Sequence, residues 1–330
     1  MTGSIHDVAV VVPVYQGEEC LPSLVDELLP LAEEQKTVDG TRWRVVEVVL
    51  VHDCGPDRSD RTIRQLADAH PTLVRPVWLT RNYGQHAATV AGFASSSAPW
   101  IVTLDEDGQH DPAQIGMLLD CARTTGSALV YARPEGGAPH ARWRNFTSNL
   151  AKRFVDLVSG VATKDFSSFR LIVGERARAV AAYCGQGVYL DVALSWIIAD
   201  VSAVSVPRRA ERRPGSGYGM LRLLSHFSAL VLSSGTRPLR LVAASGVVLA
   251  TAGLVGAIYI VVVALTSEIP VPGWASISVT LLVTAGALLF SIGVVAGYVG
   301  TLLGIALGRP LYVISTDPQD LPLAADPDRE

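Results

Sequence analysis

Two long stretches without a charged side chain constrain the fold of this 330-residue chain more than any other feature. Residues 241–265 and 277–307 contain no Asp, Glu, Lys or Arg. Each stretch is long enough to cross a hydrocarbon layer of about 30 Å as a helix. The mean hydropathy of the chain, +0.33, is high for a water-soluble enzyme, and these stretches account for the excess. The pattern predicts a transmembrane hairpin; the alternative is a pair of helices buried inside a soluble core.

Charges beside the two stretches predict their orientation. The connection over residues 266–276 carries Glu268 but no Lys or Arg, whereas Arg240 precedes the first stretch and Arg309 follows the second. Because basic loops stay on the cytoplasmic side, we expect the connection outside and both flanks inside. Residues 1–7 lack the basic and apolar segments of a signal peptide. We therefore expect a multi-pass protein of the inner (plasma) membrane with its N-terminal region in the cytoplasm.

The N-terminal region alternates short apolar runs with helical patterns. Continuous runs of β-branched residues are typical of strands that are covered on both faces, and their alternation with helices indicates a mostly parallel sheet. The prediction is an α/β fold with helices on both faces of the sheet. Strands are expected at residues 8–14, 45–51, 74–79, 100–104 and 128–132, and helices at 21–34, 60–69, 86–94 and 113–123.

The segment before the first apolar stretch is strongly basic. From residue 207 to 240 it contains seven arginines and one acid, Glu211. A basic segment beside a membrane span is attracted to anionic lipid headgroups. Nucleic acid is a poor candidate partner, because these arginines adjoin the apolar stretch rather than lie among aromatic residues. The chain is thus divided into an α/β domain (1–206), a basic juxtamembrane segment (207–240), a transmembrane hairpin (241–307) and a cytoplasmic tail (308–330).

Two further patterns combine a basic face with an apolar face. Residues 143–158 and 220–231 each place Leu, Phe and Val at helical spacing, with Arg or Lys elsewhere. Helices of this kind lie in the headgroup zone, where they would bring a lipid phosphate to the edge of the sheet. For the first pattern, packing on the sheet is an equally open alternative.

An acidic triplet follows the fourth expected strand. Asp105 and Asp107 flank Glu106, and an Asp-X-Asp turn can offer one oxygen from each side to a hard divalent cation, with phosphate oxygens as the other ligands. The alternative is a solvated acidic turn. The metal interpretation is favoured because polar residues follow the other strands at the same carboxyl edge, where such sheets bind ligands. These residues are Tyr15, Gln16, Glu18, Asp53, Arg81, Asn82 and Arg133.

Eight motifs carry a family resemblance. The first four are residues 12–19 (VPVYQGEE), 51–57 (VHDCGPD), 81–88 (RNYGQHAA) and 104–109 (LDEDGQ). In order and spacing they resemble the inverting glycosyltransferases of family 2 with the Rossmann-like GT-A fold. The others are residues 165–171 (DFSSFRL), 215–218 (GSGY), 237–240 (RPLR) and 308–313 (GRPLYV). They resemble the polyprenyl-phosphate branch, which includes dolichol-phosphate mannose synthase and bacterial undecaprenyl-phosphate glucosyl and aminoarabinosyl transferases.

The resemblance implies an enzyme that moves a sugar from a UDP- or GDP-sugar to a polyprenyl phosphate such as undecaprenyl or decaprenyl phosphate. It implies Mg²⁺ or Mn²⁺ as cofactor, and membrane lipids as surroundings. The implied nucleotide-binding residues are Pro13, Tyr15, Glu18, Asp53, Asp105 and Glu106. The implied metal ligands are Asp105, Asp107 and Gln109. The implied phosphate- or acceptor-binding residues are Arg133, Arg144, Arg209, Arg212 and Ser216. The implied catalytic residues are Asp107 and Asp165.

Several of these roles stay open. Asp165 aligns with a carboxylate that acts either as a general base or in positioning and helix capping. The spacing before the Ser-X-Tyr pair departs from the family pattern, so either Arg209 or Arg212 takes the phosphate-binding role. Gly108 stands where relatives carry an apolar residue. Arg170 is interpreted as a structural ion-pair partner.

A catalytically silent membrane scaffold or glycolipid-binding partner with the same fold is the alternative function, and the intact Asp-X-Asp argues against it. A homo-oligomer is a possible partner arrangement, because both apolar stretches carry small-residue faces on which helices can pack. These faces contain Gly253, Gly256, Gly293 and Gly297.

Overall fold

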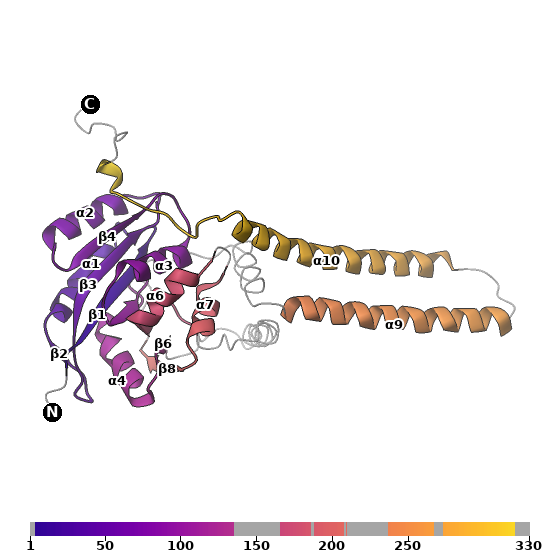
Figure 1. Ribbon diagram of the computed structural model, residues 1–330, viewed down its shortest axis with the longest axis horizontal. Helices are drawn as coiled ribbons and strands as arrows, with labels where there is room; N and C mark the ends of the chain where they lie inside the picture. Colours follow the sequence, from indigo (N-terminus) through magenta and orange to yellow (C-terminus); the bar gives the residue numbers. More distant parts are fainter. Residues whose placement is uncertain are drawn as a thin grey trace.

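A nine-stranded sheet forms the centre of the N-terminal domain in the computed structural model (Figure 1). The structure describes residues 4–134, 166–185, 188–207, 209, 237–266 and 273–320. The strand order is β8-β6-β7-β5-β1-β3-β4-β9, and β2 pairs with β3. The strands are β1 (His6–Val14), β2 (Gln35–Lys36), β3 (Arg42–His52), β4 (Val74–Leu79), β5 (Trp100–Thr103), β6 (Leu129–Pro134), β7 (Arg170–Val173), β8 (Val201–Val206) and β9 (Ile314–Ser315).

Helices cover the sheet on both faces, as the apolar strands predict. Because successive side chains of a strand point to opposite faces, β1 contributes to two separate cores. Val10 and Val12 lie in one core and Val11 lies in the other, and all three are completely buried. The first core is closed by α1 (Leu21–Leu28), α2 (Ser59–Ala69) and α4 (Ile115–Thr125), and the second by α3 (Gln85–Ser95), α6 (Gly174–Tyr183) and α7 (Leu190–Ile197).

Strand direction brings the ends of the predicted strands to one edge. β1 is parallel to β3 and β5, β3 is parallel to β4, and β6 is parallel to β8. β7 is antiparallel to both of its neighbours, β5 and β6, so β6 again runs in the direction of β5. The carboxyl ends of β1, β3, β4, β5 and β6 therefore share one edge of the sheet. The predicted α/β class is confirmed.

The predicted helix over residues 21–34 is shorter in the structure. α1 ends at Leu28 and is followed by a 3₁₀ turn, η1 (Leu29–Ala32). Pro30 accounts for the break, because it has no amide hydrogen with which to continue the α-helical pattern. A second 3₁₀ turn, η2 (Pro112–Gln114), precedes α4, where the sequence predicts one continuous helix.

Two long helices project from the domain side by side (Figure 1). They are α9 (Arg237–Thr266) and α10 (Trp274–Ala306). Val283–Ala306 of α10 is long and apolar enough to cross a membrane, with a mean hydropathy of 2.1 and no residue buried. Within the described side chains, α9 contributes a second apolar segment, Val242–Gly256. Burial of the pair inside a soluble core is contradicted, since side chains such as Phe290 are exposed.

The segment after α10, which was predicted from the sequence as a tail, returns to the sheet. β9 pairs antiparallel with β4, and the Thr80 amide donates to the Val313 carbonyl at 3.1 Å. Beyond β9, Asp317 lies opposite the Arg64 side chain of α2, with two Arg64 nitrogens 2.8 Å from its oxygens. A short 3₁₀ turn, η4 (Pro318–Asp320), follows. The C-terminal segment thus attaches the end of the helical hairpin to the edge of the domain.

Candidate active site

The Asp-X-Asp triplet lies in a tight turn directly after β5. Leu104 is completely buried, and the chain then emerges with Asp105 and Asp107 half-buried. Gly108 has a φ of +71°, in the left-handed region that a side chain rarely adopts. The Gln109 amide donates to Asp107 Oδ1 at 3.0 Å and closes the turn. The glycine that departs from the family pattern is therefore required by the shape of this turn.

Asp105 is held by side chains from two other segments. Gln85 Nε2 at the start of α3 donates to Asp105 Oδ1 at 2.6 Å, and Ser168 Oγ donates to Asp105 Oδ2 at 2.5 Å. The Asp105 amide in turn donates to His110 Nδ1 at 3.2 Å. No role for Gln85, Ser168 or His110 was predicted from the sequence. Gln85 and Ser168 lie within two of the family motifs, at residues 81–88 and 165–171, so the motifs could have marked them as site residues. Their contacts with Asp105 depend on tertiary structure.

The donor set of this turn suits a hard divalent cation that also binds phosphate. Gln109 Nε2 lies 2.9 Å from Asp107 Oδ2, so an amide group accompanies the two carboxylates. Within the described residues, no cluster of three His, Cys, Asp or Glu side chains has the geometry of a metal site. Mg²⁺ is commonly held by one or two carboxylates, with substrate phosphates and water completing its coordination. Asp105, Asp107 and Gln109 fit a cation of this kind, bound together with a diphosphate.

The loop after β1 borders this turn. Pro13 is buried within β1, whereas the Tyr15 side chain is 37% exposed at the edge of the sheet. The Glu106 carboxylate contacts this loop, because it accepts hydrogen bonds from the Tyr15 and Gln16 amides. Glu18 Oε2 accepts from the Arg58 amide at 3.0 Å, at the start of α2. The structure therefore brings the predicted nucleotide-binding residues of the β1 loop and of the acidic turn together.

Asp53 lies below the surface of the same edge and is 2% exposed. Its two oxygens accept hydrogen bonds from the amides of Tyr83 (2.7 Å) and Gly84 (2.8 Å), so it anchors the loop between β4 and α3. Burial raises the pKa of this carboxyl, and the two amide donors offset part of the rise. Its predicted contact with the nucleotide stays a prediction.

Two of the four predicted phosphate-binding arginines, Arg133 and Arg209, lie among the described residues. Arg133 lies at the end of β6 and is exposed. Arg209 pairs with Glu27 of α1 at 2.6 Å and with Asp111, just beyond the acidic turn, at 2.9 Å. Four predicted site residues lie outside the described residues, as do the helices predicted at 143–158 and 220–231. These site residues are Arg144, Asp165, Arg212 and Ser216.

A buried ion pair lies behind the site. Arg170 of β7 contacts Asp191 of α7 through Nη1, and the Tyr131 hydroxyl donates to the same Asp191 oxygen at 2.8 Å. All three residues are at most 4% exposed. Arg170 Nε also donates to Thr103 Oγ1 at 3.2 Å, at the end of β5. The interpretation of Arg170 as a structural ion-pair partner is confirmed.

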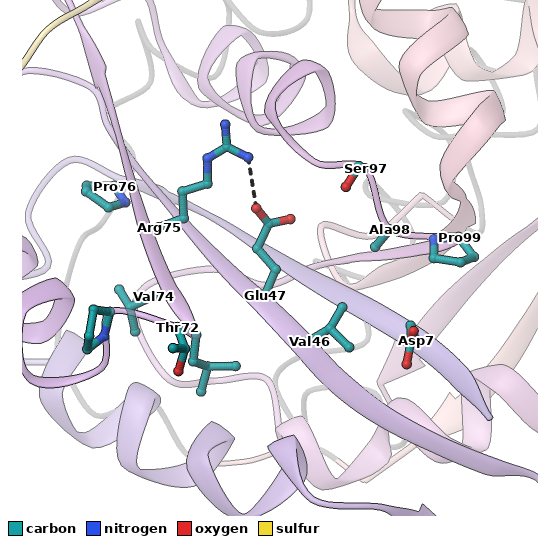
Figure 2. Close-up of a pocket in the computed structure, with 12 residues that line it drawn as sticks. Asp7, Val46, Glu47, Thr72, Val74, Arg75, Pro76, Ser97, Ala98 and Pro99 are labelled. Atoms are coloured by element: carbon teal, nitrogen blue, oxygen red, sulfur yellow. Dashed lines mark hydrogen bonds and ion pairs between the residues drawn. The ribbon is translucent and has the colours of Figure 1, made fainter.

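A separate depression of about 650 Å³ opens at the opposite, amino edge of the sheet (Figure 2). It is lined by the starts of β1 and β4, by β3, and by the residues before β5. Figure 2 shows Arg75 turned toward Glu47, and their charged groups are 3.0 Å apart. The third charged group, Asp7, pairs with Arg44 at 2.7 Å. Because these charges are paired within the protein and the strands end elsewhere, the acidic turn is the better candidate site.

The chain matches the family model for glycosyl transferase family 2 over residues 9–171. It is 31% identical over 328 residues to undecaprenyl-phosphate 4-deoxy-4-formamido-L-arabinose transferase of Pseudomonas aeruginosa (strain LESB58), covering 96% of this chain and 93% of that protein. Identity to the enzyme of the same name from Klebsiella pneumoniae (strain 342) is 29% over 317 residues, covering 94% and 93%.

Among solved structures, glucosyl-3-phosphoglycerate synthase from Mycobacterium tuberculosis, in complex with Mn²⁺, UDP-glucose and phosphoglyceric acid, is similar over 70% of this chain and 80% of its own. That similarity has a TM-score of 0.46 and 20% sequence identity.

The chain belongs to glycosyl transferase family 2. It is a glycosyltransferase whose relatives, over nearly its whole length, are named undecaprenyl-phosphate sugar transferases. The predicted resemblance to the polyprenyl-phosphate branch is confirmed, and so is the mixed α/β sheet of the GT-A type.

Proposed function

We propose that this enzyme transfers a sugar from a UDP- or GDP-sugar to a polyprenyl phosphate, such as undecaprenyl or decaprenyl phosphate, with inversion at the sugar. The observation that supports this most directly is the acidic turn at the carboxyl edge of the sheet, in a chain that aligns over 96% of its length with an undecaprenyl-phosphate sugar transferase. The product would be a polyprenyl-monophosphate sugar, which serves as a donor for cell-envelope glycan or glycoprotein assembly.

The donor would lie across the ends of β1, β3 and β5. Its diphosphate would meet Asp105, Asp107 and Gln109, which would hold Mg²⁺ or Mn²⁺. The bound cation would neutralise charge on the diphosphate as the sugar leaves it. The nucleoside would extend toward the Tyr15 ring, with Pro13, Glu18 and Asp53 forming or supporting that part of the site.

The reaction would be a single displacement. A phosphate oxygen of the polyprenyl phosphate attacks the anomeric carbon, and the bond from that carbon to the diphosphate breaks as the new bond forms. The nucleoside diphosphate leaves with the bonding electron pair. Because the acceptor phosphate is already largely anionic near neutral pH, a general base has little to contribute, and Asp165 acts either as that base or in positioning.

Arginines would stabilise the phosphates, since a guanidinium group offers paired donors to phosphate oxygens. Arg133, Arg144 and Ser216 are proposed for this role together with Arg209 or Arg212. Arg209 is already engaged by Glu27 and Asp111. To bind phosphate, Arg209 would have to break its contact with one of these two carboxylates. Both Arg209 and Arg212 are therefore kept as candidates for the phosphate-binding residue.

The membrane would supply the acceptor. The exposed apolar surfaces of α9 and α10 support their insertion as a hairpin, with the domain and the C-terminal segment at the cytoplasmic face of the inner membrane. An added Cβ at Gly253, Gly256 or Gly293 would meet no atom within 4 Å, so these positions leave space for a neighbouring helix. Pairing of copies through these faces stays a prediction.

The proposal is tested by incubating the purified full chain with Mg²⁺ or Mn²⁺, undecaprenyl phosphate and radiolabelled UDP- and GDP-sugars. The panel includes nucleotide-linked 4-deoxy-4-formamido-L-arabinose, the sugar in the relatives' name. We expect organic-extractable label from one or two donors, and loss of at least a hundredfold in Asp107→Ala. Asp39→Ala is the matched control, because Asp39 is exposed in the turn between β2 and β3, at the opposite edge.

Two outcomes would contradict the proposal. Extractable product that persists unchanged in Asp107→Ala would refute the metal assignment. Absence of product with every donor, together with no metal-dependent binding of UDP or GDP, would instead favour the catalytically silent scaffold. A titration of nucleotide with and without Mg²⁺ therefore separates the two functions even if the correct sugar is missing from the panel.

A further inference from the structure

Glu106 is the middle residue of the acidic turn, but its carboxylate binds backbone amides of the loop after β1. Its Oε2 accepts a hydrogen bond from the Tyr15 amide at 2.9 Å, and its Oε1 accepts one from the Gln16 amide at 3.0 Å. We propose that Glu106 is a positioning residue that ties the β1 loop to the acidic turn. It would thereby fix the distance between the site of the nucleoside and the site of the diphosphate. The inference rests on the proposed function, in which one donor spans both.

The β1 loop is shaped to receive this carboxylate. A Cβ atom added to Gly17 would lie 2.8 Å from Glu106 Oε2 and 2.8 Å from Leu21 Cγ. Real Cβ atoms do not approach other atoms this closely, so a side chain at position 17 would push the loop and the carboxylate apart. Glycine at this position is therefore explained by the contact with Glu106 and with α1.

The other half of the loop is held from a different strand end. The Glu18 amide donates to Asp57 Oδ2 at 3.0 Å, and Asp57 also accepts from the Ser59 hydroxyl at 2.7 Å at the start of α2. Glu106 therefore secures only the part of the loop at Tyr15 and Gln16. Loss of Glu106 is expected to release this part locally, while Asp57 keeps the following residues in place.

Both oxygens of Glu106 are used in these contacts, and an ionised acceptor makes stronger hydrogen bonds to amides than a neutral one does. Without the carboxylate, the two adjacent amides lose acceptors within the protein. The Tyr15 ring, 37% exposed, would then sample positions that do not match a bound nucleoside. The consequence is a less preorganised donor site, which costs affinity because the loop must be ordered on binding.

A direct contact between Glu106 and the nucleotide is the competing explanation, and it is the role that the family resemblance implies. The two explanations differ in the absence of nucleotide. A positioning residue protects the Tyr15 and Gln16 amides in the free enzyme, whereas a residue that acts only as a nucleotide ligand has no effect there.

The test compares hydrogen exchange in the nucleotide-free full chain for the wild type, Glu106→Ala and Glu106→Gln. We expect at least tenfold faster exchange of the Tyr15 and Gln16 amides in Glu106→Ala. An intermediate increase is expected in Glu106→Gln, because a glutamine oxygen can still accept from one amide. Glu33→Gln is the matched control, since Glu33 is exposed after η1. Exchange across β3 reports whether the fold is intact and should not change.

UDP and GDP binding, measured with and without Mg²⁺, provides the second readout. We expect affinity about tenfold weaker in Glu106→Ala and about threefold weaker in Glu106→Gln, with or without the cation. Wild-type exchange rates in both Glu106 variants would refute the positioning role, even if nucleotide affinity fell. Failure of the wild type to bind any nucleotide would instead refute the proposed function, and the exchange comparison would still decide whether Glu106 holds the loop.

Discussion

The buried ion pair behind the site gives a sharp stability prediction. Replacing Asp191 by alanine leaves the Arg170 guanidinium, which is 3% exposed, without its counter-charge. It also removes the acceptor of the Tyr131 hydroxyl, which donates at 2.8 Å. Neither group can turn to water, because the second core surrounds Tyr131 and α7. The substitution therefore strands a charge and a hydroxyl in an apolar environment.

The size of the effect follows from this burial. Removing one partner of a buried ion pair typically costs about 3–5 kcal/mol, most of it from the charge left behind. For a domain of this size, each kcal/mol lowers the melting temperature by about 2–4 °C. We therefore expect Asp191→Ala to lower the melting temperature by about 6–20 °C. Replacing the whole group, with Arg170→Met, Asp191→Leu and Tyr131→Phe combined, should recover at least half of the loss, because no polar group then stays unpaired.

The assay is thermal or urea-induced unfolding of the full chain in detergent, followed by circular dichroism. Asp200→Ala is the control, since Asp200 is exposed immediately before β8. A loss below about 1 kcal/mol in Asp191→Ala would show that water reaches the pair and would refute the reasoning. A combined variant as unstable as Asp191→Ala would refute it equally, because the cost would then come from lost volume rather than from unpaired charge.

Two further predictions concern the edge of the sheet near the C-terminal segment. Asp317→Asn weakens the paired contact with Arg64 and should lower the melting temperature by about 2–8 °C. Asp320→Asn, at an exposed position in η4, is the control and should leave the melting temperature unchanged. Equal melting temperatures of the two variants would show that this contact does not hold the segment in place. Burial lowers the pKa of His52 from 6.5, so below pH 6.5 the unfolded chain takes up a proton that the folded chain does not. The free energy of unfolding of the wild type should therefore fall between pH 7 and pH 5, by at most about 1.4 kcal/mol per pH unit from this group. The fall should be smaller in His52→Phe. An identical fall in both proteins would exclude His52 as a cause.

His52 is the one described side chain with a fully buried polar atom that lacks a hydrogen-bond partner. Its ring packs edge-on against Trp78 at 5.4 Å, and the Arg64 guanidinium lies over the same Trp78 ring. Phenylalanine at position 52 keeps an aromatic ring beside Trp78 and removes the titrating group. This makes the pH comparison specific to the imidazole.

The docking of the C-terminal segment has a consequence for the proposed reaction. β9 extends the sheet beside β4, and β4 leads into the loop that Asp53 anchors through Tyr83 and Gly84. The end of α10 is thus joined to the edge of the candidate site by a short, paired segment. If α10 lies in a membrane as proposed, this attachment limits how far the donor site can move from the lipid phosphate.

The local sequence predicted most elements of residues 6–134 and their order, together with the two apolar helices. Apolar β-branched runs predict the buried parts of β1, β3, β4 and β5, because a strand segment covered on both faces is continuously apolar. The polar starts of β1 and β3, which extend the strands by two and three residues, were not predicted. The same logic located the acidic turn at a strand end. The two apolar stretches, residues 241–265 and 277–307, likewise identified α9 and α10, since each is long enough to cross a membrane as a helix.

Tertiary structure alone decided which groups meet. Nothing in the local pattern indicates that Glu106 bonds the Tyr15 and Gln16 amides, that Ser168 reaches Asp105, or that residues after α10 form an edge strand on β4. These contacts join segments far apart in the chain, and they depend on strand order and direction. Local sequence fixes the conformation of each segment through sterics and hydrophobic periodicity, whereas partners across the sheet are selected only when the whole core packs.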